Sequence, residues 1–254
     1  MTSKGDEPAA ALLELQRLTE RLRRECPWDR EQTAATIVPH TVEESYEVAD
    51  AALAGDDEKL LDELGDLLFQ VYFLALLLEE RGAGDLTRVA RGVHEKLVRR
   101  HPHVFGDVEA GTAERVRSNW ERIKREQEGR EGIFHDVAEG LPGLLYARKT
   151  QQRAKAVGFE YPDLAGALAD LADELRELEE KPSGEELGDV LFAAVNVARR
   201  LDVDPELELR RAARRFRRRV EVAETLAAET GENWSELPLD RQDEWFDRAK
   251  ERTE

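Results

Sequence analysis

Apolar residues recur at helical spacing along almost the whole chain. Leu15, Leu18 and Leu22, for example, fall on one face of a helix whose other positions are mostly charged. No segment alternates apolar and polar residues with the period of two that is typical of a half-buried strand. The pattern therefore predicts an all-α protein. The expected helices span residues 11–24, 41–53, 60–81, 86–100, 113–128, 144–157, 164–180, 185–201, 205–230 and 240–252.

One short segment occurs twice. Glu63-Leu-Gly-Asp-Leu-Leu-Phe69 and Glu186-Leu-Gly-Asp-Val-Leu-Phe192 match at six of seven positions, which indicates two copies of one unit. Glycines and charged residues from 128 to 132, followed by Gly140-Leu-Pro-Gly143, are typical of a boundary between domains. We therefore expect two tandem helical-bundle domains, 1–130 and 131–254.

Each copy also carries acidic residues on two successive helices. In an antiparallel helical hairpin, residues that are equidistant from the turn lie level with each other. Glu47 and Glu63 share a midpoint at position 55, and so do Glu44 and Asp66. In the second copy, the corresponding pairs share a midpoint between positions 181 and 182. Each hairpin is therefore expected to bring four carboxylates level, two from each helix. The eight residues are Glu44, Glu47, Glu63, Asp66, Glu174, Glu177, Glu186 and Asp189.

Acidic runs on helices are usually solvated, and Thr41-x-x-Glu44 also fits a helix capping box. Two observations favour a different interpretation. No Lys or Arg occurs between Thr41 and Asp56, so the acids of the first helix have no basic partner nearby. Glu63 and Asp66 directly precede an apolar run, where carboxylates are costly unless they are paired or metal-bound. The pattern therefore predicts a divalent-cation site in each copy.

The chemistry of the predicted ligands selects the ion. Carboxylate oxygens suit Mg²⁺, with Mn²⁺ as a possible substitute, and no Cys or His lies near the acids to favour zinc. Mg²⁺ held by a few carboxylates is typical of sites that handle phosphates, and a further carboxylate could act as a general base. Phosphates also need cationic donors, which Lys96, Arg99 and Arg100 and the arginines of 210–219 could supply. The chain has no P-loop and no dinucleotide glycine pattern.

Composition restricts the partners and the compartment. The 254 residues carry a formal net charge of −18, which argues against duplex nucleic acid because phosphate backbones attract positive surfaces. The longest apolar stretch, 67–78, is too short to span a bilayer, so no membrane partner is expected. The single Cys26 excludes an internal disulfide, and the polar first residues lack the apolar run of a signal peptide. We expect a cytoplasmic protein.

Four strings together closely resemble the MazG family of tandem-domain nucleoside triphosphate pyrophosphohydrolases, within the all-α NTP-pyrophosphatase superfamily. They are Cys-Pro-Trp-Asp-Arg-Glu-Gln-Thr33, Thr-Val-Glu-Glu-Ser-Tyr-Glu-Val48, Glu-Leu-Gly-Asp-Leu-Leu-Phe-Gln70 and Arg-Arg-His-Pro-His-Val-Phe-Gly106. The resemblance extends over nearly the whole chain. It implies Mg²⁺-dependent cleavage of (d)NTPs to monophosphate and pyrophosphate. It also implies a homodimer, broad base tolerance and a house-cleaning role against non-standard nucleotides.

The resemblance also assigns roles to individual residues. The family's metal-ligand pattern falls on Glu43, Glu44, Glu47, Glu63 and Asp66 in the first copy, and on Glu174, Glu177, Glu186 and Asp189 in the second, where Asp173 replaces the first Glu. Its basic and aromatic positions, which imply phosphate and base contacts, fall on Lys96, Arg100, Trp120, Lys124, Lys149, Lys155, Arg215, Arg219 and Trp245. Ala249 stands where a lysine is expected after Trp245, and Lys250 is the available substitute.

Two other interpretations stay open at this point. The chain could act on a narrower substrate, such as dUTP, dCTP or phosphoribosyl-ATP. It could also be a helical scaffold or regulator whose acidic clusters bind a cation only for stability. The duplication and the His-Pro-His-Val-Phe105 string favour the broader family.

Overall fold

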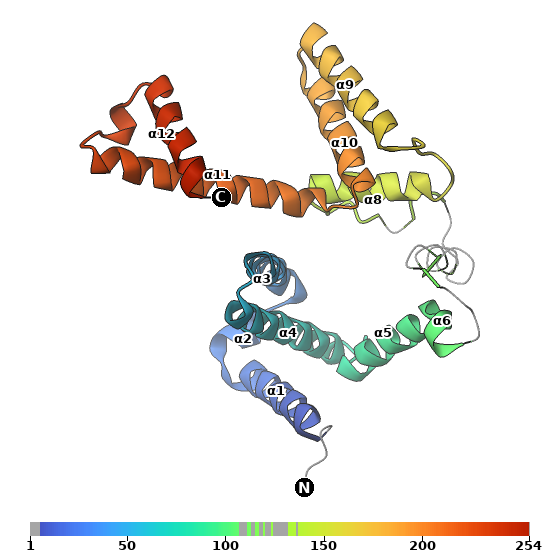
Figure 1. Ribbon diagram of the computed structural model, residues 1–254. Helices are drawn as coiled ribbons and strands as arrows, with labels where there is room; N and C mark the ends of the chain where they lie inside the picture. Colours follow the sequence, from blue (N-terminus) through green and yellow to red (C-terminus); the bar gives the residue numbers. More distant parts are fainter. Residues whose placement is uncertain are drawn as a thin grey trace. The chain divides into compact units, whose positions relative to one another are not determined.

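The computed structural model describes residues 6–106, 111–112, 115–116, 119, 123, 132–135 and 137–253. These residues form α-helices and one 3₁₀ turn, with no strand among them, which confirms the all-α prediction (Figure 1). The chain divides into two compact units, Met1–Glu128 and Gly129–Glu254. None of the described helices is both long enough and apolar enough to cross a bilayer.

The first unit is built around a helical hairpin. Helix α3 (Ala34–Ala54) runs into α4 (Asp57–Glu80) through Gly55, whose φ of 69° is left-handed and therefore favours glycine. The side chain of Asp56 accepts a hydrogen bond from the Lys59 amide and so begins α4. Ile37 from α3 packs with Phe73 and Leu77 from α4 in a cluster of buried side chains, which fixes the two helices against each other.

The remaining helices of the first unit lie against or beyond α4. They are α1 (Asp6–Glu25), α2 (Pro27–Glu31), α5 (Leu86–Arg100) and α6 (Pro102–Phe105). Arg23 holds three of these elements together. Its guanidinium pairs with Glu80 at the end of α4 at 2.7 Å and also donates to the carbonyls of Asp29 and Gln32 near the C-terminal end of α2.

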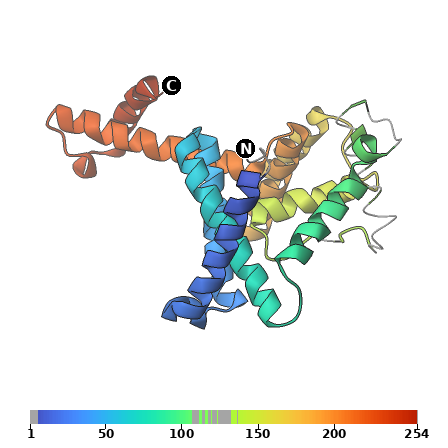
Figure 2. The same cartoon turned by 90° about the horizontal axis from the view of Figure 1, so that it is seen from below.

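The second unit contains a similar hairpin and a separate helical pair. The hairpin consists of α9 (Leu164–Glu180) and α10 (Gly184–Arg200), and α8 (Gly143–Lys155) packs on α10. Helix α11 (Pro205–Glu229) extends away from them, and α12 (Leu239–Arg252) folds back on its far part after the 3₁₀ turn η1 (Trp234–Glu236) (Figures 1 and 2). Leu226 of α11 and Trp245 of α12 belong to the buried cluster of this pair.

Most expected helices agree with the structure to within a few residues, and three local features differ. Helix α3 begins at Ala34, so Thr41 is not a helix cap; its hydroxyl donates to the Ile37 carbonyl at 3.4 Å inside the helix. The cap is Thr33, which exchanges hydrogen bonds with Thr36. Pro39 made the start of α3 hard to predict from the sequence, because a proline inside a helix removes one backbone hydrogen bond. Two segments expected to be non-helical are the short helices α2 and α6, and the expected helix 113–128 lies largely outside the described residues.

Candidate metal centres

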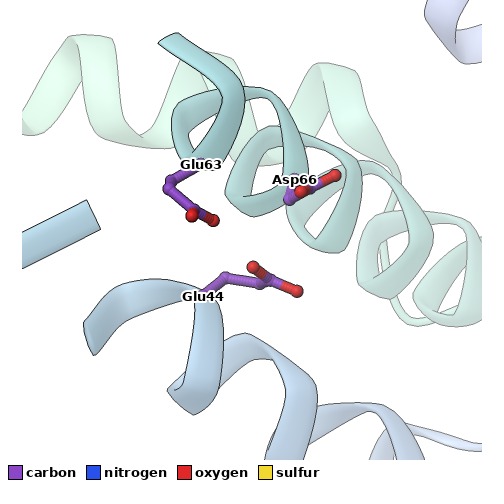
Figure 3. Close-up of side chains that lie close together, drawn as sticks. All are labelled: Glu44, Glu63 and Asp66. Carbon is purple, nitrogen blue, oxygen red and sulfur yellow. The ribbon is translucent and has the colours of Figure 1, made fainter. Parts of the chain in front are cut away.

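The first hairpin brings together acidic side chains from both of its helices. Glu44 on α3 faces Glu63 and Asp66 on α4, and these three residues offer carboxylate oxygens that all lie within 4.8 Å of one another (Figure 3). Glu63 and Asp66 are three residues apart and therefore share one face of α4. The hairpin turn at Gly55 then places Glu44 opposite them. This cluster, Glu44, Glu63 and Asp66, is called the first carboxylate cluster.

The carboxylates of the first carboxylate cluster repel one another. Burial is the main cause that raises the pKa of Glu44, and the charges of Asp66 and Glu47 raise it further. The pKa of Glu63 is also raised, first by burial and then by Glu47. One carboxylate oxygen of Glu44, Oε2, is buried and has no hydrogen-bond partner among the described residues. Oxygen ligands, mutual repulsion and an unpartnered buried oxygen all fit a hard divalent cation.

Two other predicted acids of the first copy lie at the edge of this cluster. Glu47 is close enough to Glu63 to raise its pKa, so its carboxylate adjoins the cluster. Glu43 is different: its side chain is 66% exposed, and its carboxylate lies 3.8 Å from Nδ1 of His40. The structure thus brings together three of the four acids that the midpoint rule placed level, with Glu47 beside them, and it leaves Glu43 further out.

The second hairpin forms an equivalent group. Glu174 on α9 and Glu186 and Asp189 on α10 offer carboxylate oxygens within 4.8 Å of one another, and we call them the second carboxylate cluster. Ser183 caps α10 by accepting a hydrogen bond from the Glu186 amide at 3.1 Å. Burial again is the main cause that raises the pKa of Glu174, followed by the charges of Glu177 and Asp189. Glu177 is exposed beside the cluster and is not part of it.

Each cluster has a lysine that the sequence analysis did not identify. The ammonium of Lys59 lies 3.5 Å from Oε1 of Glu63, and that of Lys181 lies 3.2 Å from Oε1 of Glu186. Glu63 and Glu186, on the second helix of each hairpin, therefore do have a basic partner each. The sequence analysis considered only the residues between Thr41 and Asp56, which contain no Lys or Arg. Lys59 lies one helical turn before Glu63, a spacing that could have revealed that pair.

The predicted phosphate-contacting residues lie on helices other than those that carry the clusters. Lys96 and Arg100 are on α5, Lys149 and Lys155 on α8, Arg215 and Arg219 on α11, and Lys250 on α12. Lys155 pairs with Glu160 at 3.3 Å, Arg219 contacts the Thr253 hydroxyl at 3.4 Å, and Lys250 pairs with Asp247 at 2.7 Å. Trp120 and Lys124 lie outside the described residues.

Trp245 lies in a core in this structure. Its side chain is 1% exposed, and the guanidinium groups of Arg241 and Arg248 lie 4.8 Å and 4.3 Å from the ring centroid. Its indole nitrogen donates a hydrogen bond to Glu232 at 2.9 Å. This environment leaves no free ring face for a nucleobase, so the expectation of a base contact needs correction: here Trp245 packs α12 on α11.

Comparison with known proteins identifies the family. Residues 32–105, which include the first hairpin, match the profile of the MazG nucleotide pyrophosphohydrolase domain. The nucleoside triphosphate pyrophosphohydrolase of Escherichia coli strain K12 is 38% identical over 237 residues, which cover 89% of this chain and 90% of that protein. The nucleoside triphosphate pyrophosphohydrolase/pyrophosphatase MazG of Thermotoga maritima is 39% identical over 245 residues, 93% and 94% of the two chains. The chain belongs to the MazG family of nucleotide pyrophosphohydrolases.

Proposed function

We propose that this chain hydrolyses nucleoside triphosphates to monophosphates and pyrophosphate with the help of Mg²⁺, for which Mn²⁺ can substitute. Membership of the MazG family makes it a hydrolase that acts on nucleoside triphosphates. The observation that carries the metal-dependent mechanism is the pair of carboxylate clusters, each assembled from two helices of one hairpin. We propose one site per hairpin, and thus two MazG-like domains, 1–130 and 131–254.

The carboxylates have two tasks in this reaction. Glu44, Glu63 and Asp66 would hold the ion in the first site, and Glu174, Glu186 and Asp189 in the second. When bound, Mg²⁺ supplies neutralisation of phosphate oxygens and lowers the pKa of a water. Glu47 and Glu177 adjoin the clusters and are available as a fourth ligand or as the group that accepts the proton of the attacking water. Glu43 would act on the cluster only through its charge.

The substrate's remaining negative charge requires cations from the protein. The chain's net charge of −18 would otherwise repel a triphosphate. We propose Lys96, Arg100 and Lys124 for this task in the first domain, with Trp120 at the base, and Lys149, Lys155, Arg215, Arg219 and Lys250 in the second. Because Lys155 and Lys250 already pair with acids, phosphate binding there would have to replace an existing ion pair.

We also propose that the protein is a cytoplasmic homodimer. The second hairpin carries large apolar side chains that are between 46% and 51% exposed: Leu168, Leu175, Leu187, Leu191 and Phe192. Exposed apolar groups gathered on one element are typical of protein–protein contact surfaces. Sedimentation of the purified chain would test this, since a monomer at micromolar concentration would contradict it.

The activity can be tested by identifying products. The protein is incubated with Mg²⁺ and ATP, GTP, dUTP or ITP, and we expect monophosphate and pyrophosphate from each, as a house-cleaning enzyme with broad base tolerance would give. Diphosphate and orthophosphate would contradict the proposed bond cleavage. Turnover of dUTP alone would indicate a narrower enzyme, and Mg²⁺ binding without turnover would indicate a scaffold.

The assignment of the sites needs variants of each domain. We expect Glu47→Gln and Glu177→Gln each to disable only its own domain, so that each single variant keeps the activity of the other. The double variant should lose nearly all activity. A double variant with full activity would contradict the site assignment.

A further inference from the structure

A lysine lies beside each carboxylate cluster, but the two lysines come from different positions in their hairpins. Lys59 lies in the first turn of α4, four residues before Glu63. Lys181 ends α9 and reaches across the turn to Glu186, five residues later. A lysine one turn before a glutamate is common on helices, so the first pair alone would carry little weight. The second pair has no such helical origin, because residue 182, one turn before Glu186, is a proline.

Each ammonium contacts a largely buried carboxylate of its cluster. The Glu63 side chain is 8% exposed and that of Glu186 is 12% exposed, whereas the lysine side chains are 53% and 71% exposed. Each lysine side chain is therefore exposed enough to move away, whereas the carboxylate that it contacts is largely buried and needs a compensating charge.

We propose that Lys59 and Lys181 are the counter-cations of the metal-free sites, which compete with the divalent cation for Glu63 and Glu186. The proposal rests on the metal sites assigned above. In the absence of metal, each ammonium offsets part of the repulsion within its cluster and stabilises the hairpin. When the ion binds, Glu63 or Glu186 is needed as a ligand, and two cations a few ångströms apart repel each other.

Competition of this kind has a measurable cost for metal affinity. For a ligand that must displace a bound group, the apparent affinity equals the intrinsic affinity multiplied by the fraction of sites in which that group is already displaced. An exposed ion pair has a strength that corresponds to roughly a two- to fivefold change in the dissociation constant. Removing the ammonium should therefore tighten Mg²⁺ binding by that factor and lower the stability of the metal-free protein.

The test uses the full chain with one cluster disabled at a time. In a Glu174→Gln background, calorimetric titration with Mg²⁺ alone reports the first cluster, and Lys59→Met should lower the dissociation constant roughly two- to fivefold. Lys181→Met should do the same in a Glu44→Gln background. Both variants should melt at lower temperature without metal, and saturating Mg²⁺ should raise their melting temperatures more than that of their parents.

Two controls separate charge from general effects. Lys59→Arg keeps the charge and should bind Mg²⁺ as its parent does. Arg21→Met removes an exposed i,i+4 ion pair with Glu25 on α1 and should leave Mg²⁺ affinity unchanged. Unchanged or weaker Mg²⁺ binding in both lysine variants would overturn the proposal and leave the metal sites standing. If the parents bind no Mg²⁺, the site assignment and the proposal fail together.

Discussion

The two hairpins form the same kind of carboxylate cluster on different supports. Helices α3 and α4 have 21 and 24 residues, and their cluster lies on the hairpin whose buried side chains Ile37, Phe73 and Leu77 form a core of the first unit. Helices α9 and α10 have 17 residues each, and the buried cluster of their unit lies on α11 and α12 instead. Equal distance from the turn, rather than a shared core, is what the two clusters have in common.

A second difference concerns the residue four positions before Glu44 in the first unit and before Glu174 in the second. In the first unit this is His40, whose ring lies 3.8 Å from Glu43 and 6.1 Å from the ring of Trp28. In the second unit it is Asp170, which accepts a hydrogen bond from the Tyr161 hydroxyl at 2.6 Å. The charge of Asp170 raises the pKa of Glu174, so the second cluster has an additional negative neighbour that the first lacks at this place.

The largest effect should come from truncating the two cores. Phe73 is fully buried and Trp245 is 1% exposed, so replacing either with alanine should cost about 3–5 kcal/mol of folding stability. Phe73→Ala should also weaken Mg²⁺ binding at the first cluster, because Phe73 holds α4 against α3. Trp245→Ala should leave Mg²⁺ binding at the second cluster unchanged.

Thermal unfolding and Mg²⁺ titration of both variants check this difference. The Mg²⁺ titration is carried out at a temperature below the first unfolding transition, so that a loss of Mg²⁺ affinity is not confused with a loss of folded protein. If Trp245→Ala weakened Mg²⁺ binding as much as Phe73→Ala does, the second hairpin would depend on the α11–α12 core after all.

The next effect concerns acid stability of the second unit. Hydrogen bonds from Arg241 and then Trp245 lower the pKa of Glu232 to about 2. A lowered folded-state pKa stabilises the fold at pH values above the unfolded-state pKa, and this stabilisation is lost as pH falls through the folded value. Glu232→Gln should therefore melt well below the parent at pH 7, and the gap should narrow between pH 4.5 and 2. A gap that stays constant over this range would contradict the assignment.

The smallest effect is a gain in stability on mild acidification without metal. The pKa values of Glu44, Glu63 and Glu174 are raised by burial and by neighbouring carboxylates. A raised carboxyl pKa destabilises the fold where the group is ionised, and protonation removes that cost as pH falls through the raised value toward the ordinary one. The melting temperature of the metal-free protein should therefore rise as pH falls from about 7.5 toward the ordinary carboxyl range near 4.5. Double substitution of Glu44 and Glu174 with Gln should reduce this gain, and saturating Mg²⁺ should abolish it.

The fold class and most helix positions could be predicted from the sequence because apolar residues at helical spacing are a strong local signal. The midpoint rule also placed Glu44 level with Asp66, because helical geometry relates sequence distance to position along a hairpin. The i,i+4 spacing of Lys59 and Glu63 could have revealed their pair, but the contact of Lys181 with Glu186 could not be predicted, because it crosses the turn between two helices. The burial of Trp245 depends on how α12 folds back on α11, which no local pattern specifies.

The central claim is that opposed carboxylates of each hairpin jointly hold the divalent cation used on the nucleotide. The most direct measurement is a crystal structure with Mn²⁺ and a non-hydrolysable nucleoside triphosphate, in which anomalous scattering locates the metal. We predict Mn²⁺ among Glu44, Glu63 and Asp66 and among Glu174, Glu186 and Asp189, with phosphate oxygens completing its coordination. Mn²⁺ and triphosphate bound elsewhere, with these six side chains in solvent, would contradict the account.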